Sequence, residues 1–451
     1  MLSKKISCKN HKKTVKKKLR LPWFEPIELA QKISINYSDN WVFLYSALSN
    51  SEKSSRSFIA LFESQKYRGD SFDELQKIIS ADYDDQMWFG GMNYEALEQS
   101  FESKKILDST TEIVDCVNTP TIFFSKFELI FEFVHDKKYV IVHTTNDLLV
   151  NQILSFKFIP NNTEILVQNI ESNFTNLSYK KTIEDIKSMI AKGDFYQANL
   201  TRKFVGKFDK ILTNQDKFNL FSSLTKASPA NFACFMQFED IAIISSSPEL
   251  FLRSKNNKIY SKPIKGTIKR GQNLDEDNKN RQYLHNSVKE QAENLMIVDL
   301  MRNDFSRFCK LQSVKVKNLF KITAYKTIFH LSSQINGEIA QNSSVFDAIK
   351  NCFPAGSMTG APKIKVIQAL QSFEKIKRGI YSGMLGYFCG KKEINFSVVI
   401  RTLIIQKDKF EFQVGGGITF DSDPEKELQE IFSKAQGILK ILKLSNDFKF
   451  N

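Results

Sequence analysis

The chain has 451 residues, of which 42% are hydrophobic, including 39 phenylalanines, so it can form one large core or two to three average domains. No apolar stretch approaches the roughly 20 residues of a membrane span, and the N-terminus lacks the apolar core of a secretory signal. Six scattered cysteines without a C-x-x-C pair indicate neither a disulfide framework nor a zinc site. These features predict a cytoplasmic globular protein that does not contact a membrane.

The formal net charge of +14 is concentrated at the N-terminus. Residues 1–20 contain nine lysines and arginines and no acidic residue, which leaves a charge of about +5 for the rest of the chain. This composition predicts a basic, disordered tail that either contacts RNA or a membrane surface or is simply solvated. The charge of the remainder is ordinary for an enzyme, so we do not expect nucleic acid as a partner.

The segment 21–165 alternates short apolar stretches with polar turns. Alternation of this kind predicts strands at 41–45, 57–62, 121–124 and 139–143, with one helix near 71–79. The glycine pair at 90–91 predicts a turn that leads into another strand. This segment contains no evident catalytic constellation.

The second half begins with a predicted helix over 179–192, which Gly193 ends. Further on, an apolar strand at 241–244 leads to Glu249, and a second strand at 258–260 leads to Lys265. If these strands form a hairpin, Glu249 can donate a proton and Lys265 can act as a nucleophile across a cleft. Taken alone, Lys265 is better interpreted as one more solvated lysine in a lysine-rich chain.

Two predicted helices each carry a pair of glutamates three residues apart. Glu290 and Glu293 lie in a helical stretch over 280–301, and Glu427 and Glu430 follow a helix start at residue 423. Residues at this spacing share a helix face. Four converging carboxylates would repel one another unless a hard cation such as Mg²⁺ lay between them. Each pair by itself is typical of a solvated helix face.

Two glycine-containing stretches complete the set of motifs. The stretch 354–363 (PAGSMTGAPK) leads into a helix, and Gly415, Gly416 and Gly417 follow a predicted strand. Neither matches the spacing of a nucleotide-binding loop. Glycine backbone amides can approach a carboxylate closely, while a bulge or a tight turn is the alternative interpretation.

Taken together, the motifs of residues 178–440 resemble those of the chorismate-utilising enzymes. The matching stretches are GDFYQ at 193–197, SPE at 247–249, PIKGT at 263–267, AENLMIVDL at 292–300, TGAPK at 359–363 and GGG at 415–417. Residues 21–165 resemble the N-terminal region of anthranilate synthase component I more loosely. The resemblance implies an α+β fold in which two large antiparallel β-sheets pack as a sandwich with helices outside, and a chorismate-binding catalytic domain over 178–440.

Single residues distinguish the reactions within this family. Members that form aminodeoxychorismate have lysine in a P-I-K-G-T motif, as at Lys265, whereas the anthranilate and isochorismate enzymes have alanine there. Asn294 also resembles the aminodeoxychorismate form. Members that add water carry a lysine base where this chain has Gln197. The resemblance therefore implies that ammonia is added to chorismate, giving 4-amino-4-deoxychorismate for 4-aminobenzoate and folate synthesis.

The chain has no cysteine in a glutaminase-type elbow, so the resemblance implies that a separate glutaminase subunit supplies the ammonia. Anthranilate synthase component I is the alternative enzyme. A basic RNA- or membrane-surface-binding protein that uses residues 1–20 is the alternative from another class.

The resemblance also assigns roles to individual residues. Lys265 is the implied nucleophile, and Glu249 is the implied acid. The implied Mg²⁺ ligands are Glu293 and Glu430, supported by Glu290 and Glu427. The implied substrate-binding residues are Arg401, Tyr381, Gly415, Gly416 and Gly417, with Lys434, Thr359 and His330 as weaker candidates.

Overall fold

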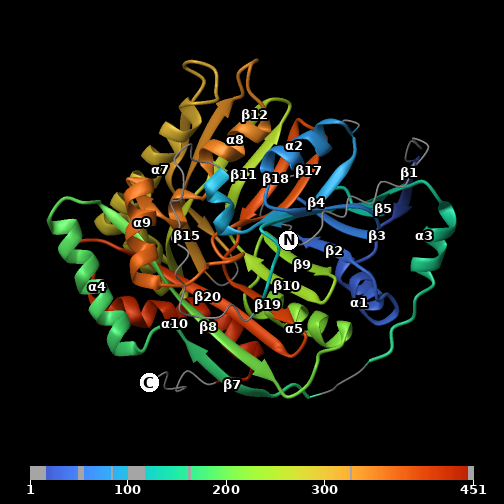
Figure 1. Cartoon of the computed structure of the whole chain (residues 1–451), viewed down its shortest axis with the longest axis horizontal. Helices are drawn as coiled ribbons and strands as arrows, with labels where there is room; N and C mark the ends of the chain where they lie inside the picture. The colour runs from blue at the N-terminus through green and yellow to red at the C-terminus, as the bar shows by residue number, and fades with distance from the viewer. Residues whose placement is uncertain are drawn as a thin grey trace.

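The computed structural model describes residues 17–48, 55–82, 85–99, 117–160, 164–325 and 328–444. Most of the predicted basic tail, 1–20, therefore lies outside the described residues. All strand pairings in the described part of the chain are antiparallel, and they connect the strands into one continuous hydrogen-bonded sheet. This sheet is folded into two layers (Figure 1).

The first layer carries the long strand pair β8–β20 at one end and the chain's first strand at the other. In order of pairing, its strands are β7 (Val167–Ser172), β8 (Gln197–Phe208), β20 (Lys409–Ile418), β19 (Thr402–Gln406), β10 (Ile241–Ser247), β9 (Phe232–Phe238), β2 (Trp41–Tyr45), β3 (Arg56–Gly69), β5 (Ile122–Val134), β6 (Tyr139–Thr144) and β1 (Lys17–Pro22). The short β16 (Gly360–Ala361) also pairs with β8.

The second layer branches from the N-terminal half of β5. In order of pairing, its strands are β4 (Met87–Met92), β17 (Met384–Cys389), β18 (Glu393–Val398), β11 (Leu250–Lys255), β12 (Lys258–Lys262) and β15 (Ile328–Glu338), which also pairs with β13 (Ile264–Lys269) and β14 (Lys315–Ala324). The central strand β5 thus belongs to both layers.

Helices cover the outer faces of both layers. Those packed on the first layer are α1 (Pro26–Asn36), α3 (Asp147–Leu154), α4 (Asn176–Ala191), α5 (Asn214–Ala227) and α10 (Pro424–Ile441). Those packed on the second layer are α2 (Phe72–Ser80), α7 (Val288–Ser306) and α8 (Val345–Cys352), while α9 (Lys363–Glu374) packs on both and α6 (Leu274–Asn286) lies against β13. Short 3₁₀ helices lie at η1 (Tyr94–Gln99) and η2 (Gly356–Met358). The expected sandwich with helices outside is confirmed.

The sequences of the buried strands are continuous apolar stretches, because both faces of these strands are covered. In β2, Val42 packs into the core between the two layers, while Trp41 and Phe43 pack against the outer helices. In β10, Ile243 faces the inner core and Ile244 the outer one. The strand predicted at 41–45 is therefore confirmed with its bounds unchanged.

The N-terminal segment shares its sheet with the rest of the chain, because β2 pairs with β9 and β4 pairs with β17. The turn predicted at 90–91 is wrong, since both glycines lie inside β4. A Cβ atom at Gly90 would come within 1.9 Å of the Phe123 carbonyl oxygen. The glycine is needed there for close packing of the backbones of β4 and β5.

Two predictions about the second half are also wrong. The helical stretch 280–301 consists of α6 and α7, which meet at Ser287, and the Ser287 hydroxyl caps α7 by accepting a hydrogen bond from the Glu290 amide at 3.4 Å. The strand at 241–244 does not form a hairpin with β12. It pairs with β9 and β19, and the intervening β11 forms the hairpin with β12 instead.

Candidate active site

Lys265 lies on β13, where the loop after β12 brings it over the first turns of α7. Its side chain is only 12% exposed, and its Nζ atom lies 3.8 Å from Glu293 Oε2. The neighbouring Gly266 has φ of 82°, a conformation that favours glycine, and a Cβ there would come within 2.9 Å of Glu290 Oε2. The interpretation of Lys265 as a solvated lysine is therefore wrong, because it is a largely buried side chain beside carboxylates.

Glu249 lies in the bend between β10 and β11 and is buried. Burial raises the pKa of its carboxyl group to about 7, although the nearby polar groups of Ser357 and Ile264 and the charge of Lys265 act in the opposite direction. The charge of Lys265 therefore acts on this carboxyl group. A carboxylic acid with this pKa can hold a proton near neutral pH and donate it.

The glutamates of α7 and α10 face one another across a gap that lysines partly fill. Lys289 Nζ lies 3.4 Å from Glu427 Oε1 and 3.9 Å from Glu293 Oε1, so it spans the two helices. On α10, Lys434 Nζ lies 2.7 Å from Glu430 Oε1 and lowers the pKa of that carboxyl group. The structure thus brings the two predicted glutamate pairs to one region.

Surplus negative charge remains in this region. Burial, followed by the charges of Glu293 and Glu430, raises the pKa of Glu290, and burial followed by the charge of Glu430 raises the pKa of Glu427. Within the described ranges, no three acidic, histidine or cysteine side chains lie close enough to hold one ion together. The carboxylate donors suit a hard cation such as Mg²⁺ in kind, while lysines supply the positive charge in this arrangement.

Gly415, Gly416 and Gly417 do not follow a strand, as predicted, but lie within β20, paired with β8. A Cβ at Gly417 would come within 2.3 Å of Gln197 Nε2 and 3.2 Å of Lys265 Nζ. The carbonyl oxygen of Gly415 accepts a hydrogen bond from Lys434 at 3.0 Å. The three glycines, which we call the glycine floor, therefore form a surface without side chains next to Lys265.

We expect Gly417→Ala to reduce turnover at least tenfold with little loss of stability. The added methyl group would displace the flexible end of Gln197 and crowd Lys265, whereas the strand pairing would be retained. Gly69→Ala is the matched control, because its Cβ would meet only the Tyr67 ring, 2.8 Å from the hydroxyl, at the end of β3, which carries no candidate site residue. Steady-state rates and melting temperatures of both variants test this, and equal losses of rate in the two would contradict it.

His330 lies on β15, which pairs with β13, and Arg401 lies directly before β19. His330 pairs with Thr267, two residues after Lys265, and its ring is buried. Burial, then the charges of Arg401 and Lys262, lowers the pKa of His330 to about 3, so the ring is neutral at physiological pH. Arg401 Nη1 donates to Ser228 Oγ at 3.3 Å, and burial lowers the pKa of the guanidinium. A cationic arginine beside this strand can pair with a carboxylate.

The other two predicted substrate-binding residues adjoin the glycine floor. The buried Tyr381 hydroxyl contacts the Gly415 backbone, and burial raises its pKa. Thr359 is fully buried, and its carbonyl oxygen accepts a hydrogen bond from the Asn199 amide at 2.8 Å. The segment before α9 is thereby fixed to β8.

Sequence reasoning named no polar residue of β8 as a substrate-binding group, although it used Gln197 to distinguish the reactions. Gln197, Asn199 and Thr201 alternate along β8, and each carries a buried polar atom without a hydrogen-bond partner among the described residues: Gln197 Oε1, Asn199 Nδ2 and Thr201 Oγ1. Polar residues at every second position of a buried strand are the signal that could have revealed them. No comparable pattern in the sequence indicates that Lys289 and Ser357 belong to the site.

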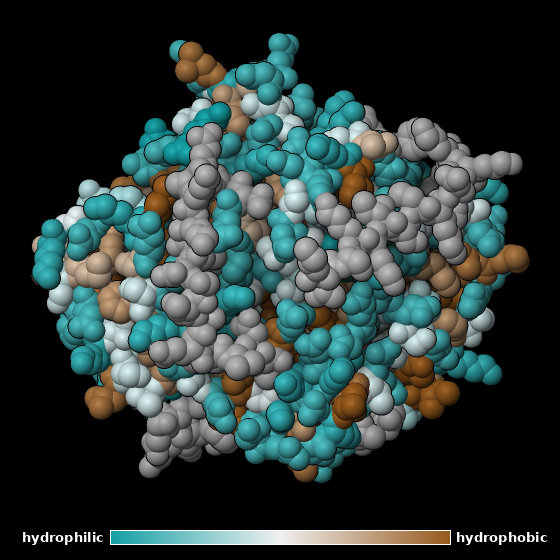
Figure 2. Space-filling view, viewed as in Figure 1, coloured by the Kyte–Doolittle hydropathy of each residue, from teal (hydrophilic) through white to brown (hydrophobic). Residues whose placement is uncertain are grey.

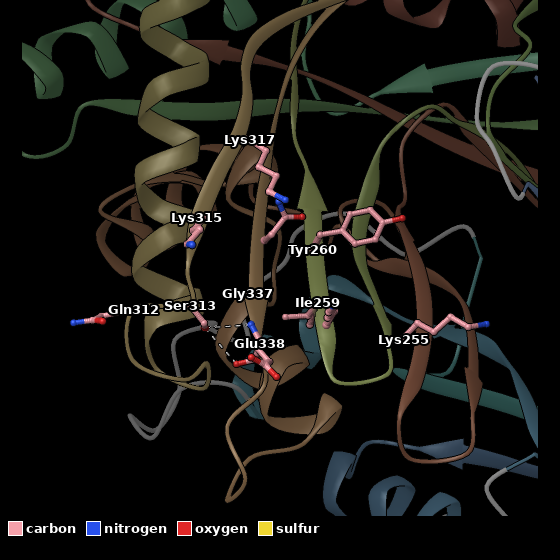
Figure 3. Close-up of a pocket in the computed structure, with 11 residues that line it drawn as sticks. Lys255, Ile259, Tyr260, Gln312, Ser313, Lys315, Lys317, Gly337 and Glu338 are labelled. Atoms are coloured by element: carbon pink, nitrogen blue, oxygen red, sulfur yellow. Dashed lines mark hydrogen bonds between the residues drawn. The ribbon is translucent and has the colours of Figure 1, made fainter.

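A separate cavity of about 500 Å³ is lined by residues of β12, β14 and β15 (Figure 3). Its lining includes Lys258, Tyr260, Lys315 and Lys317, but none of the residues discussed above. In the described chain β14 pairs only with β15, and lysines are common on exposed edge strands because they discourage pairing with other chains. Because none of the candidate site residues lines this cavity, it is distinct from the candidate active site.

The chain belongs to the family of chorismate-binding enzymes, whose sequence profile matches residues 38–440. It is 34% identical to anthranilate synthase component 1 of Lactococcus lactis, covering 73% of this chain and 75% of that protein. It is 36% identical to aminodeoxychorismate synthase component 1 of Escherichia coli, covering 68% and 67%. The resemblance that the sequence motifs indicated is confirmed.

Solved structures agree with this assignment. Anthranilate synthase component I from Streptococcus pneumoniae superposes with a TM-score of 0.74 at 25% identity, covering 86% of this chain and 92% of that chain. The menaquinone-specific isochorismate synthase MenF of Escherichia coli has the same TM-score at 15% identity, which supports the fold alone. None of the helices in the described ranges combines the length and apolar character needed to span a bilayer.

Proposed function

We propose that this protein is the chorismate-converting component of an aminodeoxychorismate synthase, which joins chorismate and ammonia to give 4-amino-4-deoxychorismate. The observation that carries the proposal is the placement of Lys265. A largely buried lysine in a PIKGT motif lies beside Glu293 and near Glu249, a carboxylic acid with a pKa of about 7. We therefore propose Lys265 as the nucleophile and Glu249 as the proton donor.

The proposed reaction has two displacements. The neutral amine of Lys265 attacks ring carbon C2 of chorismate, both double bonds of the ring diene shift by one position, and the hydroxyl at C4 leaves as water with a proton from Glu249. Ammonia then attacks C4, both double bonds shift back, and the C2–N bond to Lys265 breaks. Two displacements through a covalent intermediate replace one difficult exchange of a poor leaving group. The enolpyruvyl group is retained throughout.

The substrate carries two carboxylates, and the site offers a group for each. Arg401 is the cation proposed to hold one of them, since His330 is neutral above a pH of about 3. Tyr381 and the glycine backbone add hydrogen-bonding groups next to Lys265. Lys434, which already contacts Gly415, would help to hold the substrate over the floor.

The second carboxylate is proposed to bind between α7 and α10 together with Mg²⁺. Glu293 and Glu430 would hold the ion, with Glu290 and Glu427 supporting it directly or through water. When bound, the ion supplies charge neutralisation and withdraws electron density from the ring. Lys289 would have to leave its position between Glu293 and Glu427, which is feasible because its side chain is 47% exposed.

We expect Mg²⁺ to raise the melting temperature of the protein, and Glu293→Gln to weaken this response at least tenfold in apparent affinity. The reason is that the ion relieves repulsion among the glutamates of α7 and α10. Glu425→Gln, on an exposed face of α10 where Glu425 pairs with Lys180, is the matched control. A parent protein that shows no response to Mg²⁺ would contradict the metal proposal without any assay of activity.

A separate glutaminase subunit is proposed as the source of ammonia. The relatives named above are designated component 1 of their synthases, which supports a second component here as well. Free ammonium should support turnover in the absence of glutamine. Glutamine alone should not.

Analysis of the product tests the proposed function. The protein is incubated with chorismate, Mg²⁺ and ammonium, and a compound that yields 4-aminobenzoate only after a lyase is added would support the proposal. Fluorescent anthranilate together with pyruvate would instead identify an anthranilate synthase, the second candidate, which the Lactococcus and Streptococcus similarities favour. A protein that forms neither product from chorismate would contradict both candidate functions.

A further inference from the structure

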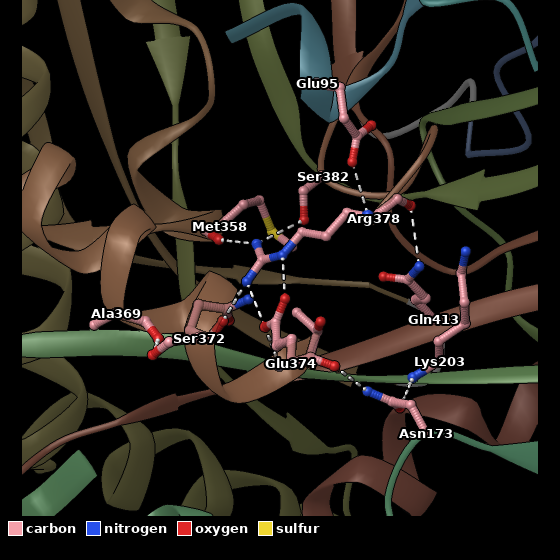
Figure 4. A network of polar contacts seen from close by, with 12 residues as sticks. Glu95, Asn173, Lys203, Met358, Ala369, Ser372, Glu374, Arg378, Ser382 and Gln413 are labelled. Atoms are coloured by element: carbon pink, nitrogen blue, oxygen red, sulfur yellow. Dashed lines mark hydrogen bonds and ion pairs between the residues drawn. The ribbon is translucent and has the colours of Figure 1, made fainter. Parts of the chain in front are cut away.

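A buried arginine, Arg378, lies in the loop after α9 within a network of polar contacts (Figure 4). The side chain of Arg378 is 2% exposed. Its Nη2 and Nε atoms donate to the two carboxylate oxygens of Glu374 at 2.7 and 2.9 Å. This two-point ion pair fixes the orientation of the guanidinium group.

The remaining donors of Arg378 reach two backbone segments that carry site residues. Nη2 donates to the Asn199 carbonyl oxygen at 2.9 Å, and Nη1 donates to the Met358 carbonyl oxygen at 2.8 Å. Asn199 lies on β8 two residues from Gln197, and Met358 directly precedes Thr359. The arginine therefore joins β8 to the segment before α9.

Its partner Glu374 extends the same connection. Glu374 Oε1 also accepts a hydrogen bond from the Thr201 amide at 2.9 Å. Asn199 and Thr201 pair across the sheet with Gly417 and Gly415, so the ion pair holds the strand that lies next to the glycine floor. A change in this ion pair would shift the floor relative to Lys265.

Residues of the N-terminal half contact the backbone and the guanidinium group of Arg378. Glu95 Oε1, on η1, accepts hydrogen bonds from the Arg378 and Gly379 amides at 2.8 and 3.3 Å. The Tyr94 amide donates to the Gly379 carbonyl oxygen at 2.7 Å, and the Arg378 guanidinium lies 4.7 Å from the centre of the Tyr94 ring. Residues almost 300 positions apart thus share one rigid contact.

We propose that Arg378 is a positioning residue through which η1 of the N-terminal half sets the shape of the substrate site. It touches neither Lys265 nor Glu249, and it acts through β8, Thr359 and the glycine floor. Lysine cannot replace it, because a compact ammonium group cannot reach Glu374 and both carbonyl oxygens in the way that a planar guanidinium does. This inference rests on the proposed function.

Kinetics of Arg378→Lys in the full chain, with chorismate and ammonium, test the inference. We expect KM for chorismate to rise at least tenfold while kcat changes less than threefold. Arg68→Lys is the matched control, because Arg68 donates to Glu63 and to the Phe124 and Tyr67 carbonyl oxygens on strands that carry no site residue. It should lower the melting temperature and leave KM unchanged.

A second pair of variants tests the role of η1 and remains informative if Arg378→Lys does not fold. Glu95→Ala removes the acceptor of the two backbone amides and should raise KM at least fivefold. Glu95→Gln keeps an acceptor oxygen and should stay within twofold of the parent. KM values within twofold of the parent in both Arg378→Lys and Glu95→Ala, or an equal rise in Arg68→Lys, would overturn the inference.

The proposed function and this inference fail in different ways. A parent protein that does not consume chorismate would overturn the proposed function, and the inference with it. A parent protein that consumes chorismate, with Arg378 variants that match its KM, would overturn the inference alone.

Discussion

Replacing Lys265 with alanine is expected to lower ammonia-dependent consumption of chorismate by about 10³-fold or more, equivalent to about 4 kcal/mol in the activation barrier. The variant retains Glu249 and the glycine floor, but it lacks the amine that is proposed to attack chorismate and release the C4 hydroxyl. The rate is measured as loss of chorismate with saturating ammonium and Mg²⁺. An unchanged rate would contradict the role of Lys265 as nucleophile.

A matched variant separates nucleophilicity from charge. Lys265→Arg keeps a cation near Glu293, 3.8 Å away in the parent, but a guanidinium remains protonated and does not attack carbon. We expect this variant to be as slow as Lys265→Ala while retaining the parent's melting temperature to within a few degrees. Recovery of most of the rate in Lys265→Arg would indicate that only the positive charge matters.

The covalent intermediate can also be observed directly. Parent enzyme that is quenched with acid during turnover should carry a mass increment equal to chorismate minus water, attached at Lys265. Both substituted proteins should lack this adduct. An adduct at another lysine, such as Lys289 or Lys434, would assign the covalent step to a different residue.

Local structure could be predicted from sequence wherever the period of apolar residues was clear. The strand at 41–45, the helix near 71–79 and the capped start of α10 after Asp423 all follow from such patterns. Which strands pair could not be predicted, because pairing depends on contacts between distant residues. β11 was overlooked, and for that reason β10 was joined to the wrong partner.

The site was only partly predictable for a similar reason. Lys265 and the paired glutamates are ordinary residues in isolation, and their burial becomes apparent only when β13, α7 and α10 are brought together. The similarity to chorismate-utilising enzymes supplied the roles that spacing alone left open. The contact of Glu95 with Arg378 joins residues 283 positions apart, and no local pattern indicates it.

The pH dependence of the reaction should reflect Glu249. Its carboxyl group has a pKa of about 7, and in the proposed reaction it must be protonated to release the C4 hydroxyl as water, so kcat/KM should fall as the pH rises above about 7. His330 cannot cause this decline, because its pKa is about 3. Glu249→Gln keeps the shape of the side chain but cannot donate a carboxylic proton, and we expect it to lower the rate by about 10²–10⁴-fold.

The same raised pKa has a consequence for stability, which Glu249→Gln tests independently of activity. An acid whose pKa is higher in the folded protein than its unfolded value of 4.5 stabilises the fold in its protonated form, and this contribution is lost as the pH rises from 4.5 through 7. The glutamine variant does not ionise, so relative to the parent it should gain up to about 3 kcal/mol in free energy of unfolding between pH 4 and pH 8. Urea unfolding of both proteins at these two pH values measures the difference. A difference that is independent of pH would show that Glu249 ionises as readily in the folded protein as in the unfolded chain, and it would remove the basis for its role as the acid.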